Sequence, residues 1–474
     1  MASRRSLLRP ILLVAPLLGL AGCALDEPTA HPSVLLVTVD TLRADYLHSY
    51  GFPLETTPHI DALAERGVVF ERAIAAATLT APAHASIMTG LYARQHSIGV
   101  RNGDTRLEGV TTLAEQFLAA GYETAAFVSN VVLRRRTGLD RGFESYDDEL
   151  VRGEINRKAY FERNAADTGR LALQWLGERS ERPFFLWVHL QDPHGPYTPP
   201  DEWRGRVGEH PLRVTRPLKL LSDNIGPTGI PAYQALGEER LPAVYAARYA
   251  EEIMYADVWV GKVVAAAEQA SGEYGLVTLF TADHGESMGE RGWFFQHGQS
   301  TTPDLARVPF IVSAPDVEPG RLADLVSHVD VAPTLLELAG VPAIAQSSGT
   351  SLAGLVRTRE ALPERTLYCD TDGEAGAYQG SRFTRVGGSI ASDRMTDVVR
   401  PLQVESFRII EGGVWQSDDV DVVAREALVR YIEARAPLVA ADQMDPEHIE
   451  RLRALGYLPP DGAANEPTPA PYAD

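Results

Sequence analysis

Three apolar segments of this chain are each followed by acidic or imidazole side chains, and this repetition constrains the fold more than any other feature. Short runs rich in branched and aromatic residues are typical of strands buried on both faces. In open α/β sheets, ligands bind outside the carboxyl ends of the strands. We therefore expect distant side chains to meet at one sheet edge. The segments and the residues after them are 34–39 with Asp40, 184–190 with Asp192 and His194, and 276–282 with Asp283 and His284.

Two more segments, 124–128 and 309–312, have the composition of buried strands, and helical patterns lie between the strands. Thr112 with Glu115 three residues later is a capping-box start. Segment 246–268 has the period of a long amphipathic helix. Alternating strands and helices predict an α/β fold, with a mostly parallel sheet covered by helices on both faces.

The strand and helix patterns weaken towards the C-terminus. Segment 199–242 is rich in Pro and Gly, and we interpret it as an irregular insertion on the active-site side. Helices are predicted at 420–433 and 446–456. The expected organisation is a catalytic domain at 33–342, a smaller α+β subdomain at 343–458 and a disordered tail, rich in Pro and Ala, at 459–474.

The N-terminus predicts export. Three arginines precede the apolar run 11–20, which is too short to span a bilayer, and the run ends in Leu20-Ala21-Gly22-Cys23. Small residues directly before a cysteine resemble a bacterial lipoprotein cleavage site. We expect 1–22 to be a signal peptide and Cys23 to carry a lipid anchor at the cell envelope, on the outer membrane or the periplasmic face. An ordinary signal peptide is the alternative.

The amino-acid composition limits the kinds of partner that the chain can bind. The net charge of −20 argues against binding to nucleic acid or to an anionic membrane surface. An anionic substrate must therefore be held by local groups, and the membrane is contacted only through the lipid. With Cys23 acylated, Cys369 is the only other thiol and no intramolecular disulfide is expected. The chain has only three lysines, Lys158, Lys219 and Lys262.

Thr80 is the candidate nucleophile. Pro82 suits the first turn of a helix and Gly90 suits its end, so Thr80 is expected at or just before the helix N-terminus. The backbone N–H groups and the helix dipole there favour an anion, and would stabilise both a threonine alkoxide and a phosphate or sulfate oxygen. The alternative is that Thr80 is only a helix cap.

Asp40, Asp283 and His284 form the candidate metal site, and Thr80 can complete it. Two carboxylates and one imidazole suit Zn²⁺ or Mn²⁺ better than Ca²⁺, which takes more oxygens; Ca²⁺ and Mg²⁺ are the alternatives. A bound divalent ion lowers the pKa of a coordinated hydroxyl. Read singly, each residue has another explanation, as a turn-forming Asp or a hydrogen-bonded loop histidine.

His194 and His297 are the other catalytic candidates. Either side chain can protonate a leaving group, hold an equatorial oxygen or bind a second metal ion. His189 lies within an apolar strand, so we expect a core histidine or one that supports a metal ligand.

At these residues the chain resembles the sulfatase family, within the alkaline-phosphatase superfamily. Four stretches resemble the family's motifs in order: the opening strand with its metal-ligand Asp, the nucleophile signature, a second metal motif and a late Asp-x-x-Pro-Thr helix. The resemblance runs from about residue 33 to 342. The stretches are 37–45, 80–90, 283–286 and 327–336.

The departures from the family pattern concern its chemistry. The resemblance implies a Cys or Ser, converted to formylglycine, where this chain has Thr80, and an Arg where it has His84. Thr41 stands in place of a second metal-binding Asp, and His284 in place of an Asn. Asn130 and His297 lie in the regions of two sulfate-binding lysines. We assign substrate contacts to His84, Asn130 and Arg101.

This altered set resembles metal-dependent phosphodiesterases and phosphoethanolamine transferases, which use a threonine nucleophile, an Asp-His pair and flanking histidines. The transferases carry transmembrane helices, and no second apolar segment of that length occurs in this sequence. We predict a metal-dependent ester hydrolase with a covalent Thr80 intermediate and a preference for phosphodiesters.

Two other functions stay open. A true sulfatase using unmodified Thr80 would release sulfate faster than phosphate from matched esters. A non-catalytic lipoprotein binding a polyanion or glycan would explain the missing Arg, Lys and second Asp. The surviving Thr, Asp and His residues argue against the second.

Overall fold

The computed structural model describes residues 31–96, 98, 106–208, 216–371, 373–387, 403–409 and 415–433. Five predictions concern residues outside these ranges: the signal peptide 1–22, the anchored Cys23, the helix at 446–456, the tail at 459–474 and the substrate contact of Arg101. Among the described helices, none has the length and apolar character needed to cross a bilayer.

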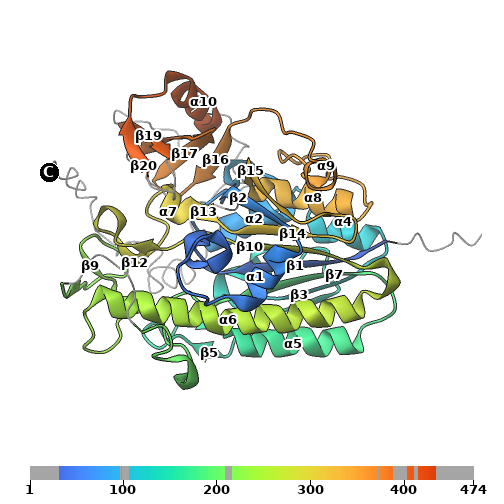
Figure 1. Cartoon of the computed structure of the whole chain (residues 1–474), viewed down its shortest axis with the longest axis horizontal. Coiled ribbons are helices and arrows are strands. Elements are labelled where there is room, and N and C mark those ends of the chain that lie inside the picture. The colour runs from blue at the N-terminus through green and yellow to red at the C-terminus, as the bar shows by residue number, and fades with distance from the viewer. Residues whose placement is uncertain are drawn as a thin grey trace, which may run out of the picture.

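Nine strands of the described chain form one mixed sheet (Figure 1). Its centre is parallel, because β10, β1, β7, β3 and β4 run in one direction, whereas β14 pairs antiparallel with β10. The five predicted strand segments are confirmed to within about a residue at each end. The order is β13 (Arg307–Val308), β2 (Val68–Ile74), β14 (Phe310–Ser313), β10 (Leu276–Ala282), β1 (Ser33–Val39), β7 (Phe184–Leu190), β3 (Glu123–Phe127) and β4 (Ser145–Asp147), with β15 (Gly320–Ser327) paired to β2.

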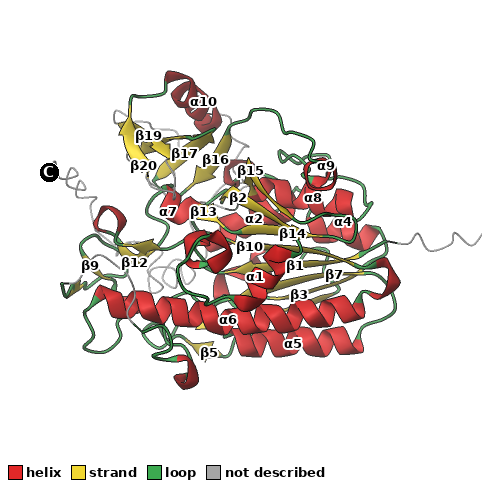
Figure 2. Cartoon of the chain, in the orientation of Figure 1, coloured by secondary structure: helices red, strands yellow, loops and turns green. Residues whose placement is uncertain are grey.

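Helices cover both faces of the sheet (Figures 1 and 2), as predicted. The predicted capping box is present: the Glu115 N–H donates to Thr112 Oγ1 at 3.1 Å and the Thr112 N–H donates to Glu115 Oε2 at 2.8 Å. The predicted helix at 246–268 is the central part of α6. One layer holds α1 (Pro58–Glu65), α5 (Ala165–Glu178) and α6 (Pro242–Ala270), and the other holds α2 (Thr80–Thr89), α4 (Leu113–Ala119) and α8 (Val331–Leu338).

A second sheet of five antiparallel strands follows the main sheet in the chain and packs against α10. It lies at the top of Figure 1, next to β15. The helix predicted at 420–433 is confirmed as α10. The elements are β16 (Leu367–Asp370), β17 (Glu374–Gln379), β18 (Arg382–Gly387), β19 (Gln403–Ile409), β20 (Trp415–Asp418) and α10 (Val422–Glu433).

The remaining described elements are short. Within 199–242 they amount to two-residue strands and single turns, which agrees with the predicted irregular insertion. The pairs are β5 (Arg152–Gly153) with β6 (Phe161–Glu162), β8 (Lys219–Leu220) with β9 (Gly229–Ile230) and β11 (Ser287–Met288) with β12 (Phe294–Gln296); the short helices are α3 (Ala93–His96), α7 (Pro303–Ala306) and α9 (Ala353–Thr358). The 3-10 turns are Ala44–Tyr46, His48–Tyr50, Val131–Leu133, Arg135–Thr137, Asp201–Trp203, Ala232–Gln234, Gly272–Tyr274, Glu290–Gly292 and His328–Asp330.

Three carboxyl groups with raised pKa values come from β6, from the end of β7 and from α6. Burial, with the charges of Glu154 and Asp192, raises the pKa of Glu162 to about 8. Burial also raises the pKa of Asp192 to about 6, although its Oδ2 accepts the Ala165 N–H at 2.6 Å. The pKa of Glu252 is raised well above its ordinary value for the same reason, with Asp192 and Glu162 adding to the effect.

These shifts predict that the free energy of unfolding falls as pH rises from about 7 to 8.5, above the range in which buried histidines with lowered pKa values, such as His84 and His297, act in the opposite direction. A carboxyl group with a raised folded-state pKa binds its proton more tightly in the folded chain. For Glu162 the stabilisation is complete below its ordinary pKa of 4.5 and is lost as pH rises through about 8. Thermal melts should show a lower Tm at about pH 8.5 than at about pH 7, and Glu162→Gln should flatten that slope. A Tm that rises over this interval would contradict the assignment.

Candidate active site

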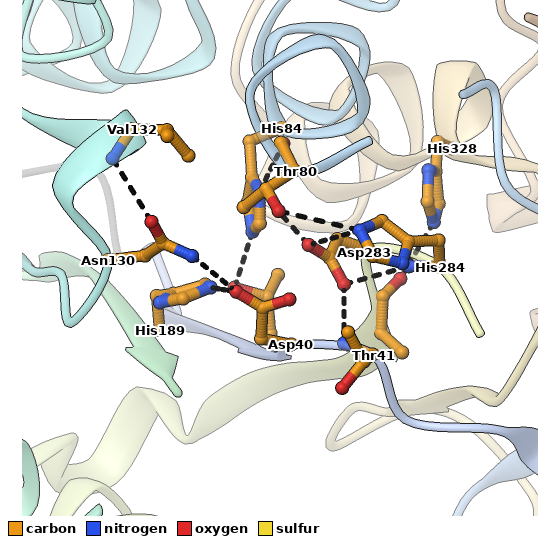
Figure 3. Close-up of polar contacts among 12 residues, drawn as sticks. Asp40, Thr41, Thr80, His84, Asn130, Val132, His189, Asp283, His284 and His328 are labelled. Atoms are coloured by element: carbon orange, nitrogen blue, oxygen red, sulfur yellow. Dashed lines mark hydrogen bonds and ion pairs between the residues drawn. The ribbon is translucent and has the colours of Figure 1, made fainter. Parts of the chain in front are cut away.

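The carboxyl ends of β1 and β10 bring Asp40, Asp283 and His284 together (Figure 3). The two strands are parallel neighbours in register, with Val39 opposite Ala282, so the residues that follow them emerge side by side. Each of the three residues is fully buried. One ligand atom from each lies within 4.8 Å of the others.

Backbone groups hold Asp283 in place. Its Oδ1 accepts the N–H of Thr41 at 3.0 Å and the N–H of His284 at 2.8 Å. Thr41 has a φ of 55°, in the left-handed region that costs a β-branched residue about 1 kcal/mol or more. The Tyr249 hydroxyl donates to the Thr41 carbonyl at 2.6 Å and helps to hold this backbone. The family resemblance implies a second acidic metal ligand at the position of Thr41. In this chain Thr41 instead supports Asp283 through its backbone N–H.

Asp40 is supported by Asn130 and His189 (Figure 3). Asn130 Nδ2 donates to Asp40 Oδ2 at 2.7 Å, and His189 Nε2 lies 3.6 Å from the same oxygen. Asn130 Oδ1 accepts the Tyr160 hydroxyl at 2.8 Å, which leaves its amide group committed on both sides. We predicted Asn130 as a substrate contact, but the structure places it behind a candidate metal ligand. His189 lies where a supporting histidine was expected.

Thr80 begins α2, and its side chain faces His284. Thr80 Oγ1 lies 3.4 Å from His284 Nε2. His284 Nδ1 lies 3.0 Å from the Gly285 carbonyl oxygen, which can only accept, so Nδ1 carries the proton. With the proton on Nδ1, the lone pair of Nε2 is directed at Thr80 and is available to a metal ion. The helix start predicted at Thr80 and the end predicted at Gly90, whose φ is 68°, are confirmed.

His84 lies one helical turn after Thr80 and points back beneath it. Its Nδ1 donates to the Thr80 carbonyl at 2.8 Å, and its Nε2 accepts the Thr38 hydroxyl at 3.0 Å. Trp187 Nε1 donates to that hydroxyl at 3.0 Å, so the chain of hydrogen bonds is complete. Burial lowers the pKa of His84 to about 3. We predicted that His84 contacts substrate, but both its nitrogens are engaged within the protein, and we assign it to holding the start of α2.

The residues present fit a divalent metal ion. Within the described part of the chain, Asp40 Oδ1 and Asp283 Oδ2 are buried and accept no hydrogen bond, a costly state that a cation would relieve. Burial raises the pKa of Asp40 to about 6, as expected for a carboxylate without a counterion. Two carboxylate oxygens, His284 Nε2 and the Thr80 hydroxyl form a four-donor set typical of Zn²⁺ or Mn²⁺. Asp283 also lies near His84 and His189, but His84 has no nitrogen to offer that group.

His194 and His297 form a second cluster beside His284. The ring centroids of His284 and His297 are 4.5 Å apart, and those of His297 and His194 are 5.3 Å apart. His297 Nδ1 lies 3.3 Å from Glu286 Oε1, which leaves Nε2 as the nitrogen for a substrate. Burial lowers the pKa of His297 to about 4, and burial with the nearby His297 lowers that of His194 well below its ordinary value. Both predicted histidines therefore reach the site.

Aromatic and cationic side chains that the sequence did not indicate lie next to His194. The Arg157 guanidinium carbon lies 4.3 Å from the ring centroid of Tyr160 and 4.1 Å from that of Tyr233. Tyr160 stacks on His194 with centroids 5.6 Å apart. Arg157 also forms an ion pair with Glu154. Nothing in the sequence links Arg157 to His194.

Removing the Asn130 side chain is expected to weaken metal binding. Asn130→Ala deletes the hydrogen bond to Asp40 Oδ2 and exposes no new ligand, so affinity for Zn²⁺ should fall by about 10- to 100-fold. Competition with a chromogenic chelator measures this. Asn164→Ala is the control, because Asn164 caps α5 and should lower stability by about 1 kcal/mol with unchanged affinity. Equal affinity in both variants would show that Asn130 does not support the metal ligand.

The comparisons with known proteins identify the family of the chain. A family model for the sulfatases matches residues 32–341, more than half of the chain. A sulfatase of Formosa agariphila is 25% identical over 383 residues, covering 70% of this chain and 74% of its own. An arylsulfatase of Clostridium perfringens is 26% identical over 385 residues, covering 69% and 79%.

A solved structure shows the same fold. The phosphonate monoester hydrolase of Agrobacterium radiobacter matches with a TM-score of 0.64 at 18% identity, covering 90% of this chain and 96% of that one. The family match, the relatives and the strand-end site point the same way. The chain belongs to the sulfatase family and is a hydrolase that acts on ester bonds.

Proposed function

We propose that this protein hydrolyses phosphodiesters through a covalent ester on Thr80. The observation that carries the proposal is the position of Thr80 Oγ1, at a helix N-terminus and 3.4 Å from His284 Nε2, beside two buried carboxylate oxygens that accept no hydrogen bond within the described chain. A hydroxyl placed there can be deprotonated and directed at an electrophile. The rest of the site supplies groups for the other side of the reaction.

The proposed metal ligands are Asp40, Asp283, His284 and Thr80. A divalent ion held there would supply Lewis acidity and lower the pKa of the Thr80 hydroxyl. With both aspartates ionised, one such ion brings the local charge close to zero. His84, His194 and His297 are neutral at pH 7, because burial lowers their pKa values. A site of this charge suits a singly charged group, as in a phosphodiester or a sulfate monoester, better than a doubly charged phosphomonoester.

The steps follow from the residues around Thr80. The Thr80 hydroxyl loses its proton to solvent, and the alkoxide attacks the central atom in line with the leaving oxygen. The leaving oxygen departs with the electron pair of its ester bond and takes a proton from His297 Nε2. His297 Nδ1 faces Glu286 Oε1 at 3.3 Å, so a proton can pass from the carboxyl group to the ring. Water then attacks the Thr80 ester, its proton returns to His297, and Thr80 is released. His194 is placed to hold an equatorial oxygen.

Phosphate esters are preferred to sulfate esters because Thr80 lacks the second oxygen of an aldehyde hydrate. A threonine ester has a single oxygen on its Cβ, so the intermediate cannot collapse by elimination as an ester of an aldehyde hydrate can. Both steps must then be displacements at the central atom, which is the ordinary course of phosphoryl transfer. Sulfate ester hydrolysis is the second candidate, favoured by the family match over residues 32–341 and by the arylsulfatase relative.

We also propose that the protein acts at the cell envelope, anchored by a lipid on Cys23. The support is the apolar run that ends in Leu20-Ala21-Gly22-Cys23. The chain made with its own N-terminus in a Gram-negative host should incorporate labelled palmitate and sediment with membranes. Cys23→Ser should lose both properties. If the wild-type chain incorporates no palmitate, the lipid anchor is refuted and the alternative, an ordinary signal peptide, is favoured.

The proposed function is tested with metal-reconstituted protein that lacks the residues up to Cys23. Matched aryl phosphodiester, phosphomonoester and sulfate ester substrates are compared at equal leaving group. We expect kcat/KM to be highest for the phosphodiester. Faster release of sulfate than of phosphate would favour the second candidate, sulfate ester hydrolysis. Activity that a chelator does not reduce would refute metal dependence. Tight metal binding without turnover of any ester would instead favour a binding protein.

A further inference from the structure

Residues of the C-terminal sheet reach two loops of the candidate active site. We call residues 76–79, which lead into Thr80, the nucleophile loop, and residues 297–302 the His297 loop. Asp370 and Thr371 lie at the end of β16, and Glu374 begins β17. These three residues are at most 7% exposed. They come from outside the segment matched by the family model, which ends at residue 341.

Glu374 binds the His297 loop. Its Oε1 accepts the Ser300 hydroxyl at 2.8 Å, the Thr301 N–H at 2.7 Å and the Thr301 hydroxyl at 2.6 Å. Its Oε2 accepts Arg385 Nη1 at 2.8 Å, so the carboxylate is fully used. Three donors from two successive residues fix both the backbone and the side chains of the loop three residues after His297. A carboxylate accepting several buried hydrogen bonds fixes geometry tightly.

Asp370 and Thr371 connect the same strand end to both loops. The Asp370 N–H donates to the Ala76 carbonyl at 3.0 Å, and the Thr78 N–H donates to the Asp370 carbonyl at 3.1 Å. The Thr371 hydroxyl donates to the Gly298 carbonyl. The nucleophile loop and the His297 loop are therefore attached to one short piece of the C-terminal sheet.

The two loops also touch each other directly. The Thr78 hydroxyl donates to the Ser300 carbonyl at 3.0 Å. Gly298 has a φ of 80°, and a Cβ there would lie 2.6 Å from the Leu79 side chain. The two loops are therefore in direct contact through one hydrogen bond and through the packing of Gly298 against Leu79. A displacement of the His297 loop would therefore move His297 relative to Thr80.

We propose that Glu374 is a positioning residue that sets the distance between His297 and Thr80, so that the C-terminal sheet is part of the catalytic apparatus. The inference rests on the proposed roles of Thr80 as nucleophile and His297 as proton donor. Glu374 touches no reacting group itself. His297 serves both steps of the proposed mechanism, but only the first, protonation of the leaving oxygen, depends on the leaving group. The ratio kcat/KM reports on that first step alone, so the effect of Glu374 on His297 must appear there.

Leaving-group dependence tests this assignment. A phenolate of low pKa departs without a proton, whereas a phenolate of high pKa needs one. Across a series of aryl phosphodiesters, Glu374→Gln should lower kcat/KM by about threefold for dinitrophenol and about 100-fold for unsubstituted phenol. Glu374→Asp should recover part of the loss on the poor leaving groups.

Glu405→Gln is the matched control. Glu405 is the other acidic partner of Arg385 and contacts neither loop through its side chain, so its removal should leave kcat unchanged for every ester. Thr371→Val provides an independent variant if Glu374→Gln does not fold, because it deletes only the hydrogen bond to Gly298; it should show the same leaving-group pattern at smaller size. Near-ultraviolet circular dichroism checks that each variant is folded.

Two outcomes overturn the proposal: an equal loss for good and poor leaving groups, which marks a general structural role, or full activity with all of them. Failure of the proposed function is detected separately, since Thr80→Ala would then keep the wild-type rate on the same series. With Thr80→Ala inactive and His297→Ala showing the steep leaving-group pattern, a flat pattern for Glu374→Gln refutes the positioning role alone.

Discussion

Replacing Thr80 with alanine is expected to lower kcat by at least about 10³-fold on every ester that the protein cleaves, because the nucleophile of the proposed mechanism is removed. Thr80→Ser retains the hydroxyl and should keep a measurable part of the activity. Steady-state kinetics on the metal-loaded protein measure both. A merely capping role for Thr80 predicts a loss of stability of about 1 kcal/mol with little change in turnover.

The control for Thr80 is Thr89, a buried threonine at the other end of the same helix. Its hydroxyl donates to the Ala85 carbonyl at 2.7 Å and lies away from the candidate metal ligands. Thr89→Ala should therefore change stability but not kcat. If Thr80→Ala and Thr89→Ala kept equal activity, the nucleophile assignment would be untenable.

Asp283→Asn is expected to have opposite effects on stability and on activity. Asparagine keeps the shape of Asp283 and an oxygen for the N–H groups of Thr41 and His284, but lacks the charge that a metal ion needs. Activity should fall by about 10³-fold and bound metal should be lost. The metal-free protein should gain stability, because burial and the Asp40 charge raise the pKa of Asp283 and make its ionised form costly.

Metal analysis and thermal melts at pH 7 distinguish this from a structural role. Asp257→Asn is the control, since Asp257 is buried and accepts the N–H groups of His59 at 3.1 Å and Ile60 at 2.8 Å at the start of α1, not those that hold Asp283. It should keep metal and activity. An Asp283→Asn protein that loses stability without metal, or keeps metal when loaded, would remove Asp283 from the ligand set.

The parts of the site that follow strand ends were predictable from the sequence. Continuous apolar runs mark β1, β7 and β10, and parallel neighbours deliver Asp40, Asp283 and His284 to one edge. β2 and β15 were missed, because β2 is interrupted by Glu71 and Arg72 and β15 is only partly buried along most of its length. A half-exposed strand at the sheet margin has no continuous apolar run to mark it.

The roles of His84 and Asn130 show where residue type alone was not enough. His84 is four residues after Thr80, a spacing that places it on the same helix face and lets its ring reach the Thr80 carbonyl. That spacing was visible in the sequence and argues for support of Thr80 rather than substrate contact. The role of Asn130 follows only from the pairing of β3 with β7, because this pairing brings Asn130 to Asp40.

Arg157 and Glu374 were beyond prediction for a different reason. Each acts through partners that are distant in sequence, such as Tyr233 for Arg157 and Thr301 for Glu374. Neither lies in a motif or follows a buried strand into the site. Contacts of this kind depend on how loops pack, which local periodicity does not encode.

The most direct test of the covalent Thr80 mechanism is to trap the intermediate. Metal-loaded protein is mixed with an aryl phosphodiester, quenched in acid within milliseconds and digested, and the peptide containing Thr80 is analysed by mass spectrometry. The mechanism predicts a phosphoester adduct on Thr80 that appears with the first turnover and is absent from Thr80→Ala. An adduct on another residue, or a burst of product with Thr80 unmodified at every time point, would contradict it.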